Sequence, residues 1–399
     1  MKSNKYRILR IIARLNVGGP AKHCLWLLGL DKDDFETKLL YGQVESNEDQ
    51  IPLGPSKQLA PLSRLRRTIG LGDLIVFLSI LRHLFYYQPH IVHTHTSKAG
   101  VHGRLAAAIY NTTKHICFKP RAKVIHTFHG HTFHGYFPPW KERIFRNIER
   151  GLARIFSDKI VVISQKQFEE ICGTYKIAAK SKFHIIPLGV DTDLFKEEIL
   201  ASYRGEFREE FNIPSNWKIV ALVSRVAPIK NHAMFINVCE QYLKNHDEKI
   251  VFAIIGGGEQ QAIKHLKTLV AQRGLQQHVL FTGNRTDLAR IYADIDCMAL
   301  TSLNEGTPLS FLEGMSAKIP CISTHVGGVP DILEDRGITI QNFNVQMYTN
   351  AVHTILYDKS IREDIIHNAY NYVISNHSIK ALQNNVKNLY FDLLKAGET

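Results

Sequence analysis

Short apolar runs alternate along the chain with longer segments of helical pattern, among them 71–86 and 139–156. The runs are continuous and β-branched, without the polar–apolar alternation of a half-exposed strand, so they predict strands buried on both faces. In the first half, strands are expected at 7–15, 36–44, 90–96, 123–130, 159–164 and 183–189. In the second half, they are expected at 218–226, 249–257, 278–283, 296–302 and 320–328.

This strand–helix pattern runs twice through the chain and breaks near 191–195, just after Pro187 and Gly189. Parallel strands joined by helices form βαβ units, which build an open sheet covered on both faces. A chain of 399 residues is also longer than one hydrophobic core usually supports. We therefore expect an α/β protein with two doubly wound, Rossmann-like parallel-sheet domains, residues 1–193 and 194–376.

The formal net charge is +12, although the composition is otherwise that of a globular protein. Divided at Phe195, the first part has 29 basic and 15 acidic residues, whereas the second has 20 and 22. No acidic residue occurs from 74 to 141, a window that holds 10 of the 20 histidines. This excess indicates an acidic partner for the first domain, such as nucleic acid, anionic lipid or a phosphorylated small molecule.

The six cysteines are scattered, with no CxxC pair, which is typical neither of a disulfide framework nor of a zinc ribbon. Isolated cysteines fit a reducing compartment, so we expect a cytoplasmic protein. The longest apolar stretch, 74–81, is too short to span a bilayer and ends at Arg82. Arg10 and Arg14 interrupt the hydrophobic segment that a signal peptide needs.

Glycines follow several of the expected strands. Gly18 and Gly19 precede a helical pattern, and 256–258 and 327–328 lie in similar places. Ligands of open α/β sheets bind beyond the carboxyl ends of the strands, where glycines let backbone N–H groups approach a phosphate. A tight turn is the alternative explanation, particularly for 256–258. Neither NVGGPAKH nor GGGEQQA matches the dinucleotide fingerprint G-x-G-x-x-G.

The segment NEGTPLSFLEGMSAKIPCISTHVGGVPDIL, residues 304–333, places two carboxylates around a predicted helix start. Thr307 is expected to cap the helix and Pro308 to be its first residue. Glu305 then lies in the loop after a strand, and Glu313 lies about two turns into the helix. The free N–H groups and the dipole at such a helix start favour an anion. An ordinary capping acid and a solvated helix residue are the alternative.

A second segment, SRVAPIKNH at 224–232, places Arg225 at the end of a strand and Lys230 five residues later. Pro228 fixes the turn between them. The guanidinium offers a planar fork to phosphate oxygens, and the ammonium offers a mobile point charge. The pair therefore predicts a phosphate-binding site.

Together these segments resemble the retaining nucleotide-sugar glycosyltransferases of family 4. The resemblance covers nearly the whole chain and implies the GT-B fold, with two domains facing each other across a cleft and a helix at about 377–399 packing back on the first domain. The HTHTSKAG and HTFHG pieces most resemble the branch that builds bacterial capsule or O-antigen polysaccharide. The similar segments are NVGGPAKH, HIVHTHTSKAGVHGRLAA, VIHTFHGHTFHGYF, VVISQ, IPLGVDTDLF, SRVAPIKN, IIGGGEQ, FTGNRTDLARIYADIDCMALTS and the E-x7-E segment.

The resemblance also assigns roles to residues. It implies that Glu313 binds the ribose hydroxyls of the nucleotide and that Glu305 lies at the hydroxyls of the donor sugar. Arg225 and Lys230 would hold the diphosphate and stabilise the charge that grows as it leaves. The remaining implied donor contacts are the backbones of Gly18, Gly19, Thr307, Pro308 and Leu309, and the base-binding edge at Thr282 and Arg285.

His129 in HTFHG matches the active-site histidine of the family, with a positioning role close to the sugar. His93 and His95 are two residues apart in an expected strand and would share one face. No HExxH motif occurs, and the family requires no metal, so we expect neither a metal nor a cofactor. The other histidines nearby are His126, His131 and His134; Tyr136 and Phe137 belong either to an acceptor pocket or to the core.

We therefore expect transfer of a sugar from a nucleotide sugar, with UDP favoured and GDP-mannose open, to a lipid-linked or saccharide acceptor. The basic first domain would contact an anionic membrane at the inner face of the cytoplasmic membrane. Segment 71–86 is either an amphipathic contact element or a core helix. The alternatives are another GT-B enzyme, such as a sugar-nucleotide 2-epimerase, and a basic nucleic-acid-binding protein; we expect no nucleic-acid partner.

Overall fold

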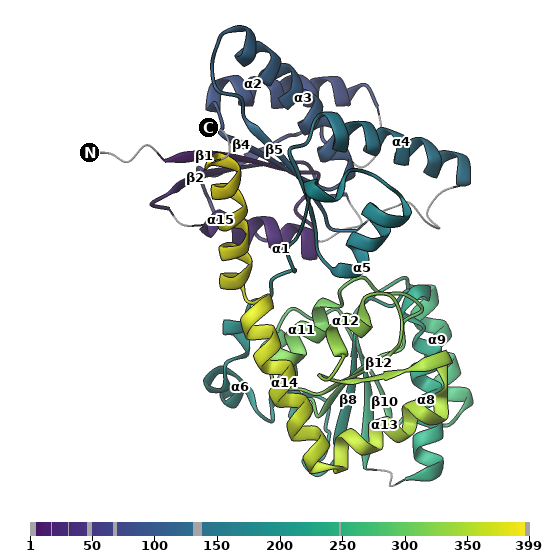
Figure 1. Ribbon diagram of the computed structural model, residues 1–399. Coiled ribbons are helices and arrows are strands. Elements are labelled where there is room, and N and C mark those ends of the chain that lie inside the picture. Colours follow the sequence, from purple (N-terminus) through teal and green to yellow (C-terminus); the bar gives the residue numbers. More distant parts are fainter. Residues whose placement is uncertain are drawn as a thin grey trace. The chain divides into compact units, whose positions relative to one another are not determined.

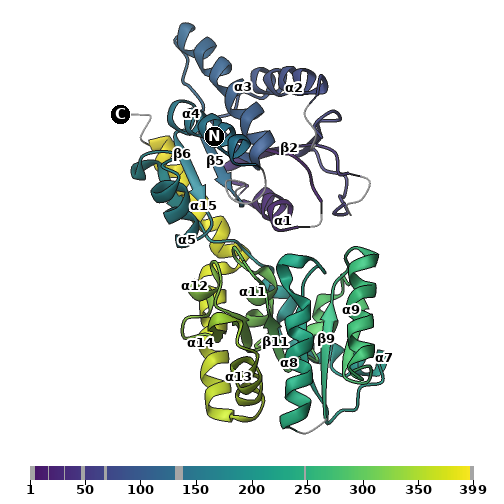
Figure 2. The same ribbon diagram turned by 90° about the vertical axis from the view of Figure 1, so that its right-hand side faces the viewer.

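The computed structural model describes residues 5–16, 18–30, 32–45, 50–66, 70–130, 138–246 and 249–395. The chain forms two compact units, one of residues Met1–Leu188 with Leu382–Thr399 and the other of residues Gly189–Ala381 (Figures 1 and 2). Each unit is a parallel β-sheet covered by helices. The chain passes from the first unit to the second at Leu188, a few residues before the expected boundary.

The first unit contains a seven-stranded parallel sheet in the order β3-β2-β1-β4-β5-β6-β7. The strands are β1 (Tyr6–Ile12), β2 (Phe35–Tyr41), β3 (Leu59–Pro61), β4 (Ile91–His95), β5 (Lys123–Phe128), β6 (Lys159–Val162) and β7 (Phe183–Ile185). The helices are α1 (Gly19–Trp26), α2 (Gly72–Tyr87), α3 (Ser97–Ile116), α4 (Pro139–Ile155) and α5 (Gln165–Phe168), with most of α15 (Ile379–Lys395). The six predicted strands are all present, but they end earlier because the apolar runs continue into the loops.

The second unit contains a six-stranded parallel sheet in the order β10-β9-β8-β11-β12-β13. The strands are β8 (Lys218–Val223), β9 (Ile250–Ile255), β10 (Val279–Gly283), β11 (Cys297–Leu300), β12 (Cys321–Thr324) and β13 (Ile338–Ile340). The helices are α6 (Glu197–Tyr203), α7 (Glu206–Glu210), α8 (His232–Asn245), α9 (Gln260–Gln272), α10 (Leu288–Tyr292), α11 (Leu309–Ser316), α12 (Val329–Leu333), α13 (Val345–Tyr357) and α14 (Lys359–His377).

Strands β3 and β13 were not predicted, since each has only three residues and lies at a sheet edge. In both sheets the strand order reverses direction at an inner strand, between β1 and β4 and between β8 and β11. Ligands of open α/β folds bind outside the carboxyl ends of the strands at such reversals. The topology therefore predicts ligand sites beyond the carboxyl ends of β1 and β4 and of β8 and β11.

The two faces of the first sheet are covered by different helices, as Figure 1 shows. Alternate residues of β1 divide between two clusters: Leu9 packs in the cluster of α2 and α3, whereas Ile8 packs in the cluster of α15. Side chains of a strand alternate between faces, so a continuous apolar run is what two covered faces require. The polar residues Arg10 and His93 fall on the face of α15.

Helix α3 lies unusually close to the other face of this sheet. A Cβ on Gly100 would lie 2.5 Å from Cε1 of His126, and one on Gly103 would lie 2.5 Å from Cγ2 of Thr94. On the same helix the fully buried Arg104 donates two hydrogen bonds, of 2.5 and 2.9 Å, to the carboxylate of Glu149 in α4. This buried bidentate pair connects α3 and α4.

Breaking this pair should be strongly destabilising. Glu149→Ala would leave the Arg104 guanidinium buried without its carboxylate, so we expect the free energy of unfolding to fall by about 3–5 kcal/mol. Denaturant titration followed by circular dichroism measures the change. Glu363→Ala is the matched control, because the Lys359–Glu363 pair is 87% and 66% exposed. The control should change stability by less than about 0.5 kcal/mol, and an equal loss in both variants would contradict the prediction.

Candidate functional site

The second unit brings together Lys230 and Glu305, which the sequence placed 75 residues apart. The Nζ atom of Lys230 lies 2.5 Å from Oε1 of Glu305, and the two side chains are only 24% and 8% exposed. The hydroxyl of Ser302 donates a further hydrogen bond, of 2.6 Å, to the same carboxylate oxygen. The carboxylate is thus fixed from two sides at the carboxyl end of β11.

The backbone around Lys230 is tied to the same strand end. Thr301 donates from its hydroxyl to the carbonyl oxygens of Asn231 at 3.0 Å and of Lys230 at 3.2 Å. The N–H of Leu303 donates to the carbonyl of Ile229 at 2.8 Å. The loops after β8 and β11 therefore hold the ammonium and the carboxylate in register.

Helix α11 begins one residue later than predicted. Pro308 occupies the capping position, Leu309 is the first helical residue, and no side chain caps the helix. The prediction that Thr307 is the cap and Pro308 the first helical residue was therefore wrong. The ring of Pro308 holds φ near −71°, which suits the extended capping position as well as the first turn. The first N–H groups of a helix have no intrahelical acceptor, so this start still favours an anion.

Glu313 lies in the second turn of α11. The hydroxyl of Tyr292, at the end of α10, donates to its Oε2 at 3.2 Å. Burial, followed by the charge of Glu313, holds the pKa of Tyr292 well above its usual range. The tyrosine therefore stays a neutral donor and orients the carboxylate; neither it nor Ser302 was singled out in the sequence, because only the fold brings them to these acids.

Glycines allow the loops around Glu305 to meet backbone to backbone. Gly327 has φ +55°, and a Cβ there would overlap the carbonyl oxygen of Glu305. Gly328 donates its N–H to that same carbonyl at 3.0 Å. The glycines after β12 thus act by supporting the Glu305 loop.

Two of the three glycines after β9 pack against the loop of Arg225 in the same way. Gly256 has φ +146°, and its Cβ would overlap the carbonyl of Ser224, while a Cβ on Gly258 would overlap that of Val226; a Cβ on Gly257 would instead lie 2.7 Å from Oδ1 of Asn284. Close packing therefore accounts for these glycines, and the tight turn with positive φ that was the alternative explanation applies to Gly256. Arg225 itself is exposed and has no hydrogen-bond or ion-pair partner among the described residues, so its guanidinium is available to an anion.

Arg285 is not available to a ligand, because carboxylates of the protein already bind its guanidinium. Its guanidinium is bound by the carboxylates of Glu210, at 2.6 and 3.0 Å, and of Asp287, at 2.6 and 2.8 Å. Thr282 lies at the end of β10, and its hydroxyl donates to the carbonyl of Gly283 at 3.1 Å. Thr282 and Arg285 therefore lie at the end of β10, and the guanidinium of Arg285 serves in ion pairs within the protein.

In the first unit, Gly18 and Gly19 lie at the start of α1, at the carboxyl end of β1. The φ of Gly18 is 172°, an extended value that any residue adopts, and a Cβ there would meet nothing closer than 4.0 Å. Neither the backbone nor the packing of the described residues therefore requires glycine at position 18. A close approach by a ligand would require it.

His129 follows β5 and joins a stack of imidazoles at the same sheet edge. Its Nε2 lies 3.0 Å from Nδ1 of His95, and the two rings stack at 5.2 Å. His93 and His95 share one strand face, as predicted, with centroids 4.3 Å apart. His23 in α1 packs edge-on against His129 at 4.8 Å. His23 ends the NVGGPAKH segment, and only the packing of α1 on the sheet reveals its place.

The other histidines of this region do not join the stack. His126 points to the opposite face of the sheet, where its Nδ1 lies 2.8 Å from the hydroxyl of Thr94. His131, His134, Tyr136 and Phe137 lie outside the described residues.

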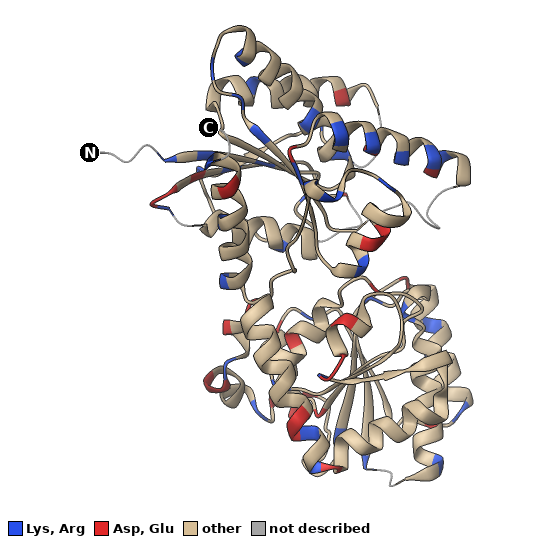
Figure 3. Cartoon of the chain, viewed as in Figure 1, with Lys and Arg blue, Asp and Glu red and all other residues tan. Residues whose placement is uncertain are grey.

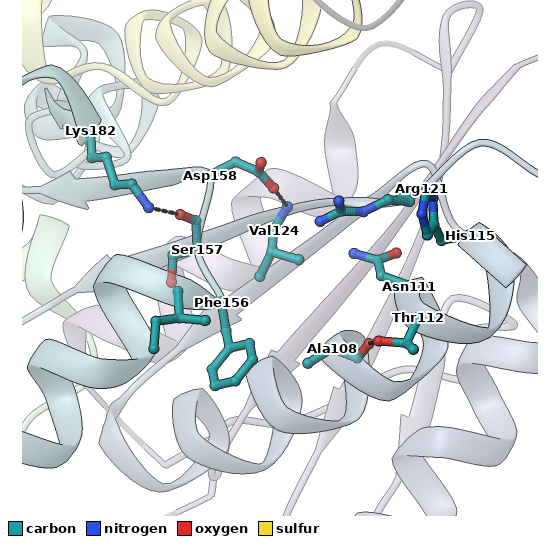
Figure 4. Close-up of a pocket in the computed structure, with 11 residues that line it drawn as sticks. Ala108, Asn111, Thr112, His115, Arg121, Val124, Phe156, Ser157, Asp158 and Lys182 are labelled. Atoms are coloured by element: carbon teal, nitrogen blue, oxygen red, sulfur yellow. Dashed lines mark hydrogen bonds between the residues drawn. The ribbon is translucent and has the colours of Figure 1, made fainter.

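A cavity of about 380 Å³ lies near the amino ends of β5 and β6 (Figure 4). Lys182 at its rim donates to the carbonyl oxygens of Ala153, Arg154 and Ser157 and so closes the end of α4. Asp158 accepts from the N–H of Val124 at 2.7 Å. The cavity is thus at the opposite edge from the site residues, and two of its charged side chains, Lys182 and Asp158, already have structural roles.

Two parallel Rossmann-like sheets with fixed carboxylates, cations and glycine loops at the strand ends define the GT-B class. Two family models match the chain: "Glycosyltransferase Family 4" over residues 25–194 and "Glycosyl transferases group 1" over residues 204–372. The chain therefore belongs to the family 4 type of glycosyltransferases. The sequence-based expectations of fold, enzyme class and family are confirmed, and the epimerase and nucleic-acid alternatives are not favoured.

Curated relatives include a UDP-Gal:alpha-D-GlcNAc-diphosphoundecaprenol alpha-1,3-galactosyltransferase of Escherichia coli, 27% identical, with 83% of this chain and 82% of the relative covered. Another is a GDP-mannose-dependent alpha-(1-6)-phosphatidylinositol monomannoside mannosyltransferase of Mycobacterium tuberculosis, 25% identical, with 60% of this chain and 61% of the relative covered.

Solved structures with the same fold include HepE of Anabaena in complex with UDP, with a TM-score of 0.76 at 18% identity over 97% of this chain and 100% of that chain. WaaG, a glycosyltransferase involved in lipopolysaccharide biosynthesis, superposes with a TM-score of 0.72 at 14% identity over 96% and 99% of the two chains.

The loop contact at Gly327 offers a test of this architecture. Gly327→Ala would force an alanine into a left-handed backbone and against the Glu305 carbonyl, so we expect a loss of at least ~2 kcal/mol in unfolding free energy. Gly306→Ala in the neighbouring loop is the control, because a Cβ there meets nothing within 4 Å. Chemical denaturation compares the two; similar stabilities would show that the loops do not depend on this contact.

Proposed function

We propose that this glycosyltransferase moves a sugar, with retention of configuration, from a UDP-sugar to a lipid-linked or saccharide acceptor in cell-surface polysaccharide biosynthesis. The name of the Escherichia coli relative combines a UDP-sugar donor with a diphosphoundecaprenol acceptor. HepE binds UDP in the same fold. The mannosyltransferase relative uses GDP-mannose, so the base is the part of the proposal that most needs a direct test.

The observation that carries the proposal is the fixed Lys230–Glu305 pair beside the start of α11. A departing nucleoside diphosphate gains negative charge, and preorganised cations and dipoles are the main means of stabilising it. Lys230 is already oriented by Glu305 at 2.5 Å, and Arg225 is unpaired among the described residues. The two cations would hold the diphosphate, with the N–H groups of Thr307 and Leu309 as further donors.

The carboxylates would then take the sugar and the nucleoside. Glu305, anchored by Ser302 and Lys230, would accept from hydroxyls of the donor sugar. Glu313 would accept from the ribose hydroxyls, with Tyr292 holding its other oxygen. Side-chain cations and a helix start supply the positive charge, so we propose that transfer requires no metal ion or other cofactor.

In the first unit, the backbone of Gly18 and Gly19 would add N–H groups to the phosphates, and His129 would position the sugar. Burial lowers the pKa of His129 to about 3, which keeps its imidazole neutral at physiological pH. A neutral ring donates or accepts one hydrogen bond at each nitrogen but carries no charge. His129 is therefore proposed as a positioning residue and not as a charged one. Thr282 remains a proposed contact of the base edge, with Arg285 acting through its ion pairs.

The donor can be identified by thermal denaturation with UDP, GDP and their sugars. A ligand that binds the folded state raises its apparent stability. UDP and a UDP-sugar should raise the melting temperature, and GDP should not. Stabilisation by GDP-mannose alone would overturn the choice of base, and formation of an epimer from UDP-N-acetylglucosamine without acceptor would overturn transfer itself.

The two carboxylates should have separable kinetic effects. Glu313→Gln removes a charged acceptor of the nucleoside, so we expect UDP affinity to fall about tenfold or more. Glu305→Gln keeps the shape but removes the charge that orients Lys230, so kcat should fall about 100-fold with a smaller change in UDP affinity. Calorimetry with UDP and initial rates of sugar transfer measure the two effects.

Glu363→Gln, an exposed glutamate of α14, is the control for loss of one negative charge and should change neither quantity. Full activity in both site variants would show that the assignment of the two carboxylates is wrong. If only the Glu305→Gln variant lost UDP binding, the roles assigned to the two glutamates would have to be exchanged.

We also propose that the outer face of α2, α3 and α4 contacts the anionic inner surface of the cytoplasmic membrane. Helix α2 buries Val76, Ile80 and Leu84, whereas Leu74 and Leu78 on its other side are 65% and 53% exposed. The helix is therefore neither wholly a core element nor a polar surface helix. An apolar outer face of this size is typical of a helix that meets lipid or a partner.

Neighbouring helices extend this face. Leu105 and Ile109 of α3 are exposed and line a groove of about 520 Å³. Trp140 and Ile144 of α4 are 61% and 49% exposed, and basic residues run along the same helix (Figure 3). Residues 74–141, which include most of α2 and all of α3, contain no acid and are complementary to anionic headgroups, whereas α4 carries Glu142 and Glu149 among its basic residues. Within the described ranges, none of the helices has the length and hydrophobicity needed to cross a bilayer, so the proposed contact is peripheral.

Co-flotation with phosphatidylglycerol-containing vesicles tests this contact. Because each leucine contributes about 1.5 kcal/mol or more when it leaves water, the double variant Leu74→Ser, Leu78→Ser should bind vesicles at least about tenfold more weakly than the unaltered chain. Met347→Ser with Tyr357→Ser is the control, since these α13 side chains are similarly exposed, at 52% and 53%. If the unaltered chain fails to float even at low salt, the membrane contact is refuted and the transfer proposal is unaffected.

A further inference from the structure

Three histidines from three different elements converge at the carboxyl edge of the first sheet. His23 comes from α1, His95 from the end of β4 and His129 from the end of β5. One ring nitrogen of each lies within 4.8 Å of the corresponding atoms of the other two. His23 and His95 are 1% and 0% exposed.

The ring nitrogens of this cluster are poorly satisfied. Both nitrogens of His23, Nε2 of His95 and Nδ1 of His129 are buried without a hydrogen-bond partner among the described residues. Buried polar atoms are normally paired, and each unpaired one is destabilising. The neighbouring His93 differs, because its two nitrogens lie 2.7 Å from the hydroxyls of Tyr390 and Thr127. Within this stack, the unpaired nitrogens therefore belong to the three clustered rings and not to His93.

Imidazole coordinates a metal ion through a ring nitrogen in its neutral form. Imidazole nitrogens favour zinc and its first-row neighbours, whereas magnesium and calcium favour oxygen. Three histidines and one water are also a known ligand set for tetrahedral zinc.

We propose that His23, His95 and His129 form a binding site for one zinc-class metal ion. Ligands at about 2.05 Å from a tetrahedral zinc lie about 3.3 Å from one another. Nδ1 of His95 and Nε2 of His129 are already 3.0 Å apart, and bonds to the metal would replace their mutual hydrogen bond. The three candidate ligand atoms lie within 4.8 Å of one another, so the rings have to approach by at most about 1.5 Å. The site shares His129 with the sugar-positioning role proposed above.

A buried cation lies close to this site. The guanidinium of Arg10 is fully buried, and its charge acts on both His23 and His95. The same charge opposes a divalent ion, and no carboxylate among the described residues completes the cluster. We therefore expect micromolar affinity, weaker than that of a structural zinc site with charged ligands.

Metal binding to the full chain tests the proposal without any substrate. The protein is treated with a chelator, desalted and titrated with zinc in a calorimeter, and cobalt is titrated in parallel with its visible absorption as the readout of tetrahedral coordination. We expect one ion per chain and a loss of at least about tenfold in affinity in His23→Asn. His129→Asn should show the same loss, and because His129 is less buried, this variant keeps the test valid if His23→Asn does not fold.

His246→Asn is the matched control. His246 and His353 stack at 4.1 Å in the second unit and form a close pair of imidazoles, outside the cluster, that could hold an ion weakly. This variant should bind zinc as the unaltered chain does. The proposal is overturned if the unaltered chain binds no zinc, if the cluster variants bind it equally well, or if His246→Asn alone abolishes binding.

The site has a consequence that depends on the proposed function. A metal ion on His129 would withdraw that ring from the donor sugar, so zinc should inhibit transfer by the unaltered chain. In His23→Asn the inhibition, normalised to the metal-free rate of the same variant, should require about tenfold more zinc. Zinc binding with no change in transfer would support the metal site and contradict the role proposed for His129.

Discussion

The structure depends on one constraint: all strands of a parallel sheet end at the same edge. Every loop that leaves a carboxyl end is therefore adjacent to the others, whatever the distance along the chain. In the second unit this places the loops after β8, β11 and β12 against one another, with Lys230 and Glu305 in contact. In the first unit it gathers α1, β4 and β5 around the imidazole stack. The candidate site residues of both units lie where the topology brings loops together.

Close backbone contact is what makes these edges rigid. Gly327 and Gly328 bring their loop onto the carbonyls of Glu305 and Gly306, and Gly256 and Gly258 do the same for the loop of Arg225. A side chain at any of these positions would separate the loops and release the charged residues from their register. Most of the glycines after strands in the second unit thus position charged side chains through the backbone, while Gly18 is left open for a ligand.

The two units differ in net charge and in how their charged groups are placed. The first unit carries most of the positive charge; the buried Arg104 is paired with Glu149, whereas several nitrogens of the imidazole stack have no partner among the described residues. The second unit is close to neutral, and its few critical cations are local. A nucleoside diphosphate needs only such local cations, whereas a broad basic and apolar face is complementary to an extended anionic surface. The net charge of the chain therefore comes from its first unit.

Much of the fold could be predicted from the sequence. Continuous apolar runs indicate strands buried on both faces, and their alternation with helices indicates parallel sheets. These patterns predict eleven of the thirteen strands in the described part of the chain. The short edge strands β3 and β13 were not predicted, because a strand of three residues is too short to show a hydrophobic pattern. The start of α11 was displaced by one residue, because the proline ring suits both the cap and the first turn.

The sequence by itself also determined which residue types serve as carboxylates, cations and glycines, since their spacing around strand ends resembles that of a known family. Only the tertiary structure decided their partners. Tyr292 orients Glu313, Glu210 occupies Arg285, and His23 joins His95 and His129. These contacts join segments far apart in the chain, and no local pattern encodes which side chain will stand opposite another. The packing of helices on the sheets fixes that choice, because it alone sets the distances between atoms.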